Sequence, residues 1–446
     1  MGRRADGVTA SASYGYDADG ELISKVDRTS GGTRYEYDPI GQLLAAVPDH
    51  AHAELFRYES RGNIEEAAGS GAARVYGRGN RLERKGSTEF LWDVDGRLVE
   101  RRELTANGTR VEKYTWNGAG MLAAVETPEG RRVEFAYDPF ARRVEKRVKE
   151  RQGVQWTTAR RTRFVLDGNV FAHEIRHETE AAGDPVVEEK TYWFDDGTFT
   201  PVAHRAGGEW FHYVNDPAGT PDELVDERGD VACRLERSPW GRGEIAPGSR
   251  TSTPLRLPGQ YEDTDVGLSY NRARYYSPEL ARFISPDPIG LRGGTNEYRY
   301  PRSPVRHTDP LGLVSPSDLA RGQQGPSNAP YTGIDAWHDT VLPKGTIVAM
   351  GEPGVTGFAT TPQAVKACNN SRSAIFQGLQ VAPHPVHGYR PTEGLYELTE
   401  DTPVAAATAL ANPQVTNPPS AGGLPQYYIP DWQSKTKRVG SIPLGP

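Results

Sequence analysis

The stretch Glu89-Phe90-Leu91-Trp92-Asp93-Val94-Asp95-Gly96-Arg97-Leu98-Val99-Glu100 decides the fold, because its pattern recurs through residues 14–144. Each copy has an aromatic residue, commonly followed by Asp, and then Gly and an apolar residue. Successive aromatic residues lie 21, 21, 18, 16, 24 and 21 residues apart, at Tyr16, Tyr37, Tyr58, Tyr76, Trp92, Trp116 and Tyr137. A period of about twenty residues predicts stacked supersecondary units.

Each unit is predicted to be one β-hairpin. Asp-x-x-Gly supplies the turn, and alternating residues flank it, as in 89–92 and 97–100. The aromatic residues can pack on the next unit, so stacked hairpins bury a face that none could bury alone. A sugar-binding platform is the functional alternative, and structural stacking is favoured over it. Further strands are expected at residues 163–166, 191–194 and 210–214.

Two copies of Asp-Pro-x-Gly follow, at Asp287-Pro288-Ile289-Gly290 and at Asp309-Pro310-Leu311-Gly312. Proline fixes its own φ and glycine tolerates left-handed geometry, so each copy predicts a turn. If the fold brings Asp287 and Asp309 together, the two carboxyls can share one proton, because like charges at short range cannot both ionise. One would then act as an acid and the other as a base toward water.

The segments 257–261, 270–278 and 282–288, with both Asp-Pro-x-Gly motifs, resemble the end of a Rhs (YD-repeat) core. The resemblance implies a hollow β-shell, of which this chain supplies only part. It also implies a self-cleaving aspartyl protease with Asp287 and Asp309 as the catalytic pair and cleavage between Leu313 and Val314. Arg282, five residues before Asp287, could favour ionisation of one carboxyl.

The expected architecture is mainly β, with a spiral shell of YD-repeat hairpins followed by a small α+β toxin domain. The expected divisions are a shell segment at 1–256, a self-cleaving region at 257–313, a Ser/Gly/Pro-rich linker at 314–330 and the toxin domain at 331–446. In that domain, strands are expected at 346–350, 357–360, 394–398 and 426–429. Helices are expected from Thr361-Pro362 to Ala367 and from Ser371 to Leu379.

Composition excludes several classes of protein. Two cysteines rule out a disulfide framework or a cysteine zinc site. His173, His177, His204 and His212 have no partners at metal-ligand spacing, so no metal is predicted. The sequence contains no run of about eighteen apolar residues, so no membrane span is expected. The N-terminus has no apolar signal region, so we expect synthesis in the bacterial cytoplasm and export by a specialised secretion system into target cells.

Residues 342–361 and 422–430 form two candidate ligand segments, in which Gly-rich turns adjoin short strands. Together they resemble ADP-ribosyltransferase-like toxins and the necrotizing-toxin NAD glycohydrolases. The resemblance implies NAD as substrate, with Gln426 holding the ribose, Phe358 stacking on nicotinamide, and Thr360 and Thr361 orienting it. Arg390 is the candidate for the pyrophosphate, because a guanidinium binds it in bidentate fashion. Met350 stands where those glycohydrolases have an Arg.

Two alternatives remain open for this domain. His338, His384 and His387, with Asp335 or Asp339, could serve a His-dependent or metal-dependent nuclease. Residues 314–446 contain only eight Lys and Arg against nine Asp and Glu, which disfavours a phosphate-tracking groove. A non-catalytic interaction module is the third class. A toxin active in the producing cell implies a cognate immunity protein; the protein or RNA target is not identified by any motif.

Overall fold

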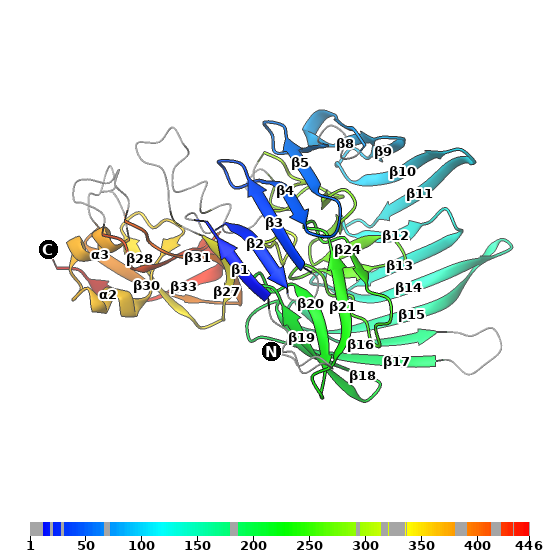
Figure 1. Ribbon diagram of the computed structural model, residues 1–446. Helices are drawn as coiled ribbons and strands as arrows, with labels where there is room; N and C mark the ends of the chain where they lie inside the picture. The colour runs from blue at the N-terminus through cyan, green and yellow to red at the C-terminus, as the bar shows by residue number, and fades with distance from the viewer. Residues whose placement is uncertain are drawn as a thin grey trace. The chain divides into compact units, whose positions relative to one another are not determined.

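The computed structural model describes residues 12–17, 21–27, 31–66, 72–178, 186–290, 295–313, 320, 335, 337–379, 390–411, 421–430 and 432–445. The chain divides into two compact units (Figure 1). The N-terminal unit comprises residues 1–195 and 199–313, and the C-terminal unit comprises residues 196–198 and 314–446. The fold is mainly β, as the sequence predicts. No helix among the described residues has the length and apolar character needed to cross a membrane.

Antiparallel strands follow one another in sequence order through two sheets of the N-terminal unit. The first sheet contains β1 (Ala12–Tyr16), β2 (Leu22–Asp27), β3 (Gly31–Tyr37), β4 (Leu43–Pro48), β5 (Glu54–Tyr58) and β6 (Ile64–Glu66). The second contains β7 (Arg74–Tyr76), β8 (Leu82–Lys85), β9 (Thr88–Trp92), β10 (Leu98–Thr105), β11 (Gly108–Trp116), β12 (Leu122–Glu126), β13 (Arg131–Tyr137), β14 (Arg143–Gln152), β15 (Gln155–Asp167), β16 (Val170–Glu178), β17 (Val186–Phe194), β18 (Pro201–Ala206), β19 (Glu209–Asn215), β20 (Pro221–Asp226), β21 (Val231–Arg237) and β22 (Gly243–Ile245), with a 3₁₀ turn, η1 (Arg78–Asn80), between β7 and β8.

The repeated aromatic residues bind the backbone of the preceding hairpin. Six of the seven donate a hydrogen bond of 2.6–2.8 Å to the carbonyl oxygen of the apolar residue that follows the previous turn. The pairs are Tyr37 to Leu22, Tyr58 to Leu43, Tyr76 to Ile64, Trp92 to Leu82, Trp116 to Leu98 and Tyr137 to Leu122. The ring therefore packs on the core while its polar end satisfies a main-chain acceptor.

The turn residues also follow one plan. Asp38, Asn117 and Asp138 each accept, through Oδ1, from the backbone N–H groups two and four residues later. The glycine of the turn is left-handed, with φ of 77° at Gly120, for example. Ala141 replaces glycine in one copy and still adopts a φ of 59°. The Asp-x-x-Gly pattern is thus a chain of side-chain-supported turns.

Strands late in the N-terminal unit contact strands from its beginning. Lys25 of β2 forms an ion pair with Asp222 of β20, with Nζ and Oδ2 2.6 Å apart. Arg237 of β21 also binds Asp222, at 3.1 Å. In Figure 1, β1 and β2 accordingly lie beside β20 and β21.

Residues 255–313, called here the inner segment, pack against the second sheet. They contain β23 (Tyr261–Asp263), β24 (Leu268–Asn271), β25 (Arg274–Ser277) and β26 (Arg282–Phe283). One hydrophobic core joins this segment to β8–β17. Tyr276 and Phe283 are completely buried.

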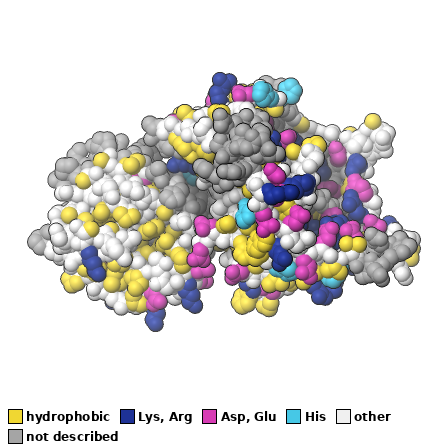
Figure 2. Space-filling model, turned by 60° about the horizontal axis from the view of Figure 1, so that its bottom comes forward, with side chains coloured by type: hydrophobic (Ala, Val, Ile, Leu, Met, Phe, Trp, Pro, Cys, Tyr) yellow, Lys and Arg dark blue, Asp and Glu magenta, His cyan; other side chains and the backbone are white. Residues whose placement is uncertain are grey.

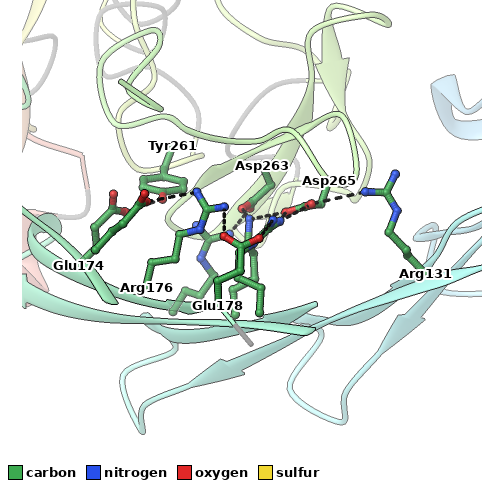
Figure 3. A network of polar contacts seen from close by, with 11 residues as sticks. Arg131, Glu174, Arg176, Glu178, Tyr261, Asp263 and Asp265 are labelled. Atoms are coloured by element: carbon green, nitrogen blue, oxygen red, sulfur yellow. Dashed lines mark hydrogen bonds and ion pairs between the residues drawn. The ribbon is translucent and has the colours of Figure 1, made fainter. Parts of the chain in front are cut away.

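A polar network fastens the inner segment to the second sheet (Figure 3). Asp263 is completely buried and binds both Arg143 of β14 and Lys146, the latter at 2.7 Å. Lys146 also binds Asp265, at 3.0 Å. The Arg143 guanidinium lies 4.5–5.5 Å from five aromatic ring centres, those of Phe135, Phe164, Phe171, Tyr261 and Tyr270. Cation–π contacts and carboxylates thus compensate the buried charge.

The C-terminal unit has two small sheets and three described helices. The first sheet has the order β27 (His338–Leu342), β31 (Thr402–Thr408), β32 (Pro425–Tyr428) and β29 (Phe358–Ala359), and the second has β28 (Ile347–Glu352), β30 (Thr392–Leu398) and β33 (Thr436–Pro443). The helices are α2 (Pro362–Ala367), α3 (Arg372–Gly378) and α4 (Trp432–Lys435). The expected strands and both expected helices are present. On the face in Figure 2, charged side chains are sparse over this unit and dense over the N-terminal unit.

Candidate functional site

Asp287 and Asp309 each open a turn that ends on a left-handed glycine. Gly290 N–H donates to the Asp287 carbonyl at 2.9 Å, and Gly312 N–H donates to the Asp309 carbonyl at 3.2 Å. The φ angles of the two glycines are 61° and 62°. Both Asp-Pro-x-Gly motifs therefore fold as the turns predicted from the sequence. Asp287 is 5% exposed and Asp309 is 2% exposed.

The tetrapeptide alone does not make this site. Asp38-Pro39-Ile40-Gly41 has the same sequence as residues 287–290 and forms a partly exposed turn of the repeat. What distinguishes Asp287 is its burial and its cationic partner.

That partner is Arg274, the first residue of β25. One nitrogen of its guanidinium, Nη2, lies 3.0 Å from Oδ2 of Asp287 and 3.2 Å from Oδ2 of Asp309. The two carboxylate oxygens can be no farther apart than the sum of these distances. Arg274 is completely buried, with its Cζ 3.6 Å from the ring centre of Phe283. Burial lowers the pKa of Arg274, and the charges of Asp287 and Asp309 oppose that effect.

The main chain after Asp309 is held from several sides. Asn271 Nδ2 donates to the Asp309 carbonyl at 2.7 Å, and Arg274 Nε donates to the Gly312 carbonyl. A Cβ atom on Gly312 would stand 2.2 Å from the Asn271 carbonyl oxygen, so glycine is required there. Leu313 N–H donates to Oδ1 of Asp309 at 2.8 Å. Asp309, Asn271 and Arg274 therefore fix the chain up to Leu313, whereas Val314 lies outside the described residues.

Arg282 lies elsewhere. Its Nη2 donates to the Asn80 carbonyl at 2.6 Å, and its guanidinium is 5.1 Å from the ring centres of Tyr76 and Tyr298. The cation that joins the two carboxylates is Arg274, which the sequence analysis did not select. Arg274 belongs to the quoted segment 270–278, but its distance in sequence from both aspartates concealed the contact.

In the C-terminal unit, three of the predicted ligand residues converge on the paired strands β29 and β32. Phe358 pairs with Tyr428 in register, and their ring centres are 4.9 Å apart. The Thr360 hydroxyl donates to the Pro425 carbonyl at 2.6 Å. Gln426, 4% exposed, donates from its side-chain amide to Asp335.

Thr361 and Arg390 have different surroundings. The Thr361 hydroxyl accepts from Ala364 N–H at 3.0 Å and caps α2, as predicted. Arg390 lies over Gly351 of β28, where a Cβ would stand 2.6 Å from Arg390 Cδ. Burial raises the pKa of nearby Glu393 to about 7, which the charge of Arg390 partly opposes. Met350 is a buried core residue of β28.

The histidine alternative falls largely outside the described part of the chain. His384 and His387 lie in residues 380–389, and the side chains of His338 and Asp339 are likewise not described. Asp335 is described and holds Gln426 and the backbone N–H of Leu410. Among described residues, no group of three His, Cys, Asp or Glu side chains could hold a metal ion.

Two family models match the chain. The model described as the teneurin YD-shell matches residues 6–292, and the model described as the Rhs1 C-terminal toxin domain matches residues 313–431. The chain belongs to the Rhs/YD-repeat toxin family. The boundary between the two matched families falls beside the aspartate pair, close to Leu313.

Two relatives of this Rhs chain are named as toxins. It is 34% identical over 340 residues to double-stranded DNA deaminase toxin A of Burkholderia cenocepacia, covering 72% of this chain and 24% of that protein. It is 33% identical over 353 residues to toxin protein Tse5 of Pseudomonas aeruginosa, covering 70% and 26%. The chain thus spans about a quarter of these relatives. A solved Rhs1-CT in complex with its cognate immunity protein RhsI1 is 26% identical, with a TM-score of 0.28, covering 30% of this chain and 98% of that one.

Proposed function

We propose that Asp287 and Asp309 cleave the peptide bond after Leu313 and release the C-terminal toxin domain. The observation that carries this proposal is the single Arg274 nitrogen bound by both carboxylates, with Leu313 N–H held by Asp309. Two buried carboxyls close together favour a state that shares one proton. Asn271 and Arg274 bind the main chain of residues 309–313 and would orient the scissile bond for hydrolysis.

In the proposed reaction, the ionised carboxyl removes a proton from water as the water oxygen attacks the Leu313 carbonyl carbon. The protonated carboxyl donates to the carbonyl oxygen. The bond from Leu313 carbon to Val314 nitrogen then breaks, and the nitrogen leaves with a proton. Arg274 acts as the positioning cation that allows two acids to remain buried side by side.

The test compares Asp287→Asn and Asp309→Asn with the parent on a denaturing gel. Both variants are expected to remain full length, whereas the parent yields fragments ending at Leu313 and beginning at Val314. Asp38→Asn is the matched control, because it alters the same tetrapeptide in an ordinary repeat turn. Cleavage that persists in both site variants would falsify the proposal.

For the released domain we propose consumption of NAD, by hydrolysis or by transfer of ADP-ribose. The convergence of Phe358, Thr360 and Gln426 on β29 and β32 supports this assignment. Phe358 would stack on nicotinamide, Thr360 and Thr361 would orient it, Gln426 would hold the ribose and Arg390 would bind the pyrophosphate. The carbon–nitrogen bond between ribose and nicotinamide breaks and nicotinamide leaves. Water or a target nucleophile then forms a bond to the ribosyl carbon.

This activity is measured as nicotinamide release from NAD by the released domain. Gln426→Ala is expected to lower the rate on the order of a hundredfold or more, as loss of one transition-state contact does. Exposed Gln363 of α2 provides the control, and Gln363→Ala should leave the rate unchanged. Intact NAD would overturn this assignment. Deaminated DNA would then favour the chemistry named for the Burkholderia relative, and degraded nucleic acid would favour the nuclease alternative.

We further propose that the whole protein is an exported antibacterial effector paired with an immunity protein. The match of residues 313–431 to the Rhs1 C-terminal toxin domain supports the effector role, and a toxin active in the producing cell implies an inhibitor. Expression of residues 314–446 in a bacterial cytoplasm should stop growth, and the inhibitor should co-purify with the Gln426→Ala variant from the producing strain. Unimpaired growth with the intact domain would contradict the effector role.

A further inference from the structure

A buried carboxyl to which the proposed chemistry gives no role lies beside Arg390 in the C-terminal unit. Glu393 of β30 is 3% exposed and pairs in register with Gly351 of β28. Partners in an antiparallel pair project to the same face of the sheet. A Cβ on Gly351 would stand 3.0 Å from Arg390 Nη1 on that face. The Arg390 guanidinium therefore covers the glycine that neighbours the Glu393 side chain.

The same face of the sheet continues to Thr360. Ala349 lies two residues before Gly351 on β28, so both positions project to the same side. Ala349 and Thr360 form an antiparallel bridge with two backbone hydrogen bonds, of 2.8 and 2.9 Å. Arg390 and Glu393 thus lie on the face of β28 that Thr360 shares, which connects them with the candidate NAD site on β29 and β32.

Glu352, the next acid along β28, belongs to the opposite face. Gly394 follows Glu393 on β30 and therefore projects away from it, and a Cβ there would collide with the Glu352 carboxylate. Arg438 holds this carboxylate through two hydrogen bonds of 2.8 Å. Glu393 is the acid whose charge acts on Arg390.

The charge of Glu393 changes near neutral pH. Burial raises its pKa to about 7, while the charge of Arg390 lowers that pKa and the charge of Glu352 raises it. Burial lowers the pKa of Arg390, but a guanidinium stays protonated in proteins. A neutral Glu393 leaves the positive charge of Arg390 available to an external anion, whereas an ionised Glu393 compensates that charge from within the domain.

We propose that Glu393 is a positioning residue for Arg390, and that its protonation state controls how tightly the C-terminal domain binds NAD. This inference rests on the proposed function, in which Arg390 binds the pyrophosphate. Protonated Glu393 leaves the guanidinium free for bidentate binding of the pyrophosphate. Ionised Glu393 attracts the same guanidinium and repels the pyrophosphate, so NAD and the proton each favour binding of the other.

The experiment measures nicotinamide release from NAD by the parent protein between pH 6 and pH 8. Because Glu393 ionises with a pKa of about 7, KM should rise by up to about tenfold over this range. Binding itself is followed by titration calorimetry at pH 8 with ADP-ribose, which carries the pyrophosphate and is not consumed. Buffers of different ionisation enthalpy should reveal proton uptake on binding.

Glu393→Gln preserves the shape of the side chain and removes its titration. Its KM should stay near the parental value at pH 6 across the whole range, and its proton uptake should vanish. Glu397→Gln, on the same strand, is the control and should keep the parental pH profile. If Glu393→Gln does not fold, proton uptake by the parent decides without any variant.

The outcomes separate the two proposals. No nicotinamide release at any pH would refute the proposed NAD chemistry. Release with a KM that is constant between pH 6 and pH 8, binding without proton uptake, or a parental pH profile in Glu393→Gln would overturn the role of Glu393 and leave that chemistry standing.

Discussion

Arg274 determines whether two aspartates can share one buried site. Besides both carboxylates, its guanidinium binds the carbonyls of Gly312 and Glu297, the latter at 2.8 Å. A lysine ammonium has three donors and no planar fork, so it cannot make all of these contacts from one position. Arg274→Lys should therefore keep the charge and lose the alignment.

We expect Arg274→Lys to slow self-cleavage on the order of a hundredfold, the effect of a small displacement of reacting groups. The measurement is the rate at which the C-terminal fragment appears after synthesis. Arg272 lies in the same hairpin but binds Asn169, Ala141 and Phe140, so Arg272→Lys is the control. A parental rate in Arg274→Lys would show that the cation does not position the pair.

His204 gives the N-terminal unit a predictable response to acid. The residue is completely buried, and its Nδ1 lies 3.0 Å from the Tyr213 hydroxyl. Burial lowers its pKa from 6.5 to about 3, and the charge of Lys190 contributes. The unfolded chain therefore binds the proton first, and stability falls as pH decreases from about 6.5 toward 3.

The expected slope from His204 is at most about 1.4 kcal/mol per pH unit in that window. Denaturant unfolding between pH 7 and pH 4 should show a shallower loss of stability in His204→Gln than in the parent. Exposed His212 is the control, and His212→Gln should keep the parental slope. Identical pH profiles for His204→Gln and the parent would contradict the effect of burial.

At the scale of the hairpin, the contribution of the left-handed glycine in each turn to the free energy of unfolding can be measured. Gly120 has a φ of 77° and open space around its Cα, with only Arg97 at 4.0 Å from an added Cβ. Gly118 lies in the same turn, without a positive φ and with nothing near an added Cβ. An added Cβ would collide with nothing at either position, so a difference between the two substitutions would report backbone strain alone.

Gly120→Ala should destabilise the unit by about 1–2 kcal/mol, the cost of left-handed geometry for a residue with a Cβ. Gly118→Ala should be neutral or slightly stabilising, because it only restricts the unfolded chain. Chemical denaturation measures both. Equal losses in the two variants would mean that the turn conformation does not set the cost.

The hairpins were predictable because their signals are local: an aromatic residue, Asp, Gly and alternation. Strand β31 was missed because Thr402–Thr408 is rich in alanine, which favours helices, yet it lies buried in the centre of a sheet. The aspartate pair could be proposed from its two motifs. Its cation could not, because only the hairpin of β24 and β25 brings Arg274 to both turns. Proximity in sequence favoured Arg282, which binds the Asn80 carbonyl instead.

At the scale of the whole molecule, the two units have separate cores. One hydrophobic cluster contains Tyr275 and Leu268 of the inner segment with shell residues, and another contains Val348, Met350 and Ile429 of the C-terminal unit. Cores without shared residues favour independent cooperative unfolding. A substitution inside one core should therefore change one transition and leave the other unchanged.

Asp263 provides the sharpest version of this test. Asp263→Asn leaves Arg143 and Lys146 buried without their shared carboxylate, a loss of about 3–5 kcal/mol for a broken buried pair. Calorimetry of the full chain should show a lower Tm for the N-terminal unit and an unchanged transition for the C-terminal unit. Asp95→Asn, at a side chain that is 65% exposed, should shift neither transition by more than the small value of a surface pair. A fall of both transitions together in Asp263→Asn would mean that shell and toxin domain unfold as one body, and release at Leu313 would then have to break more than a peptide bond.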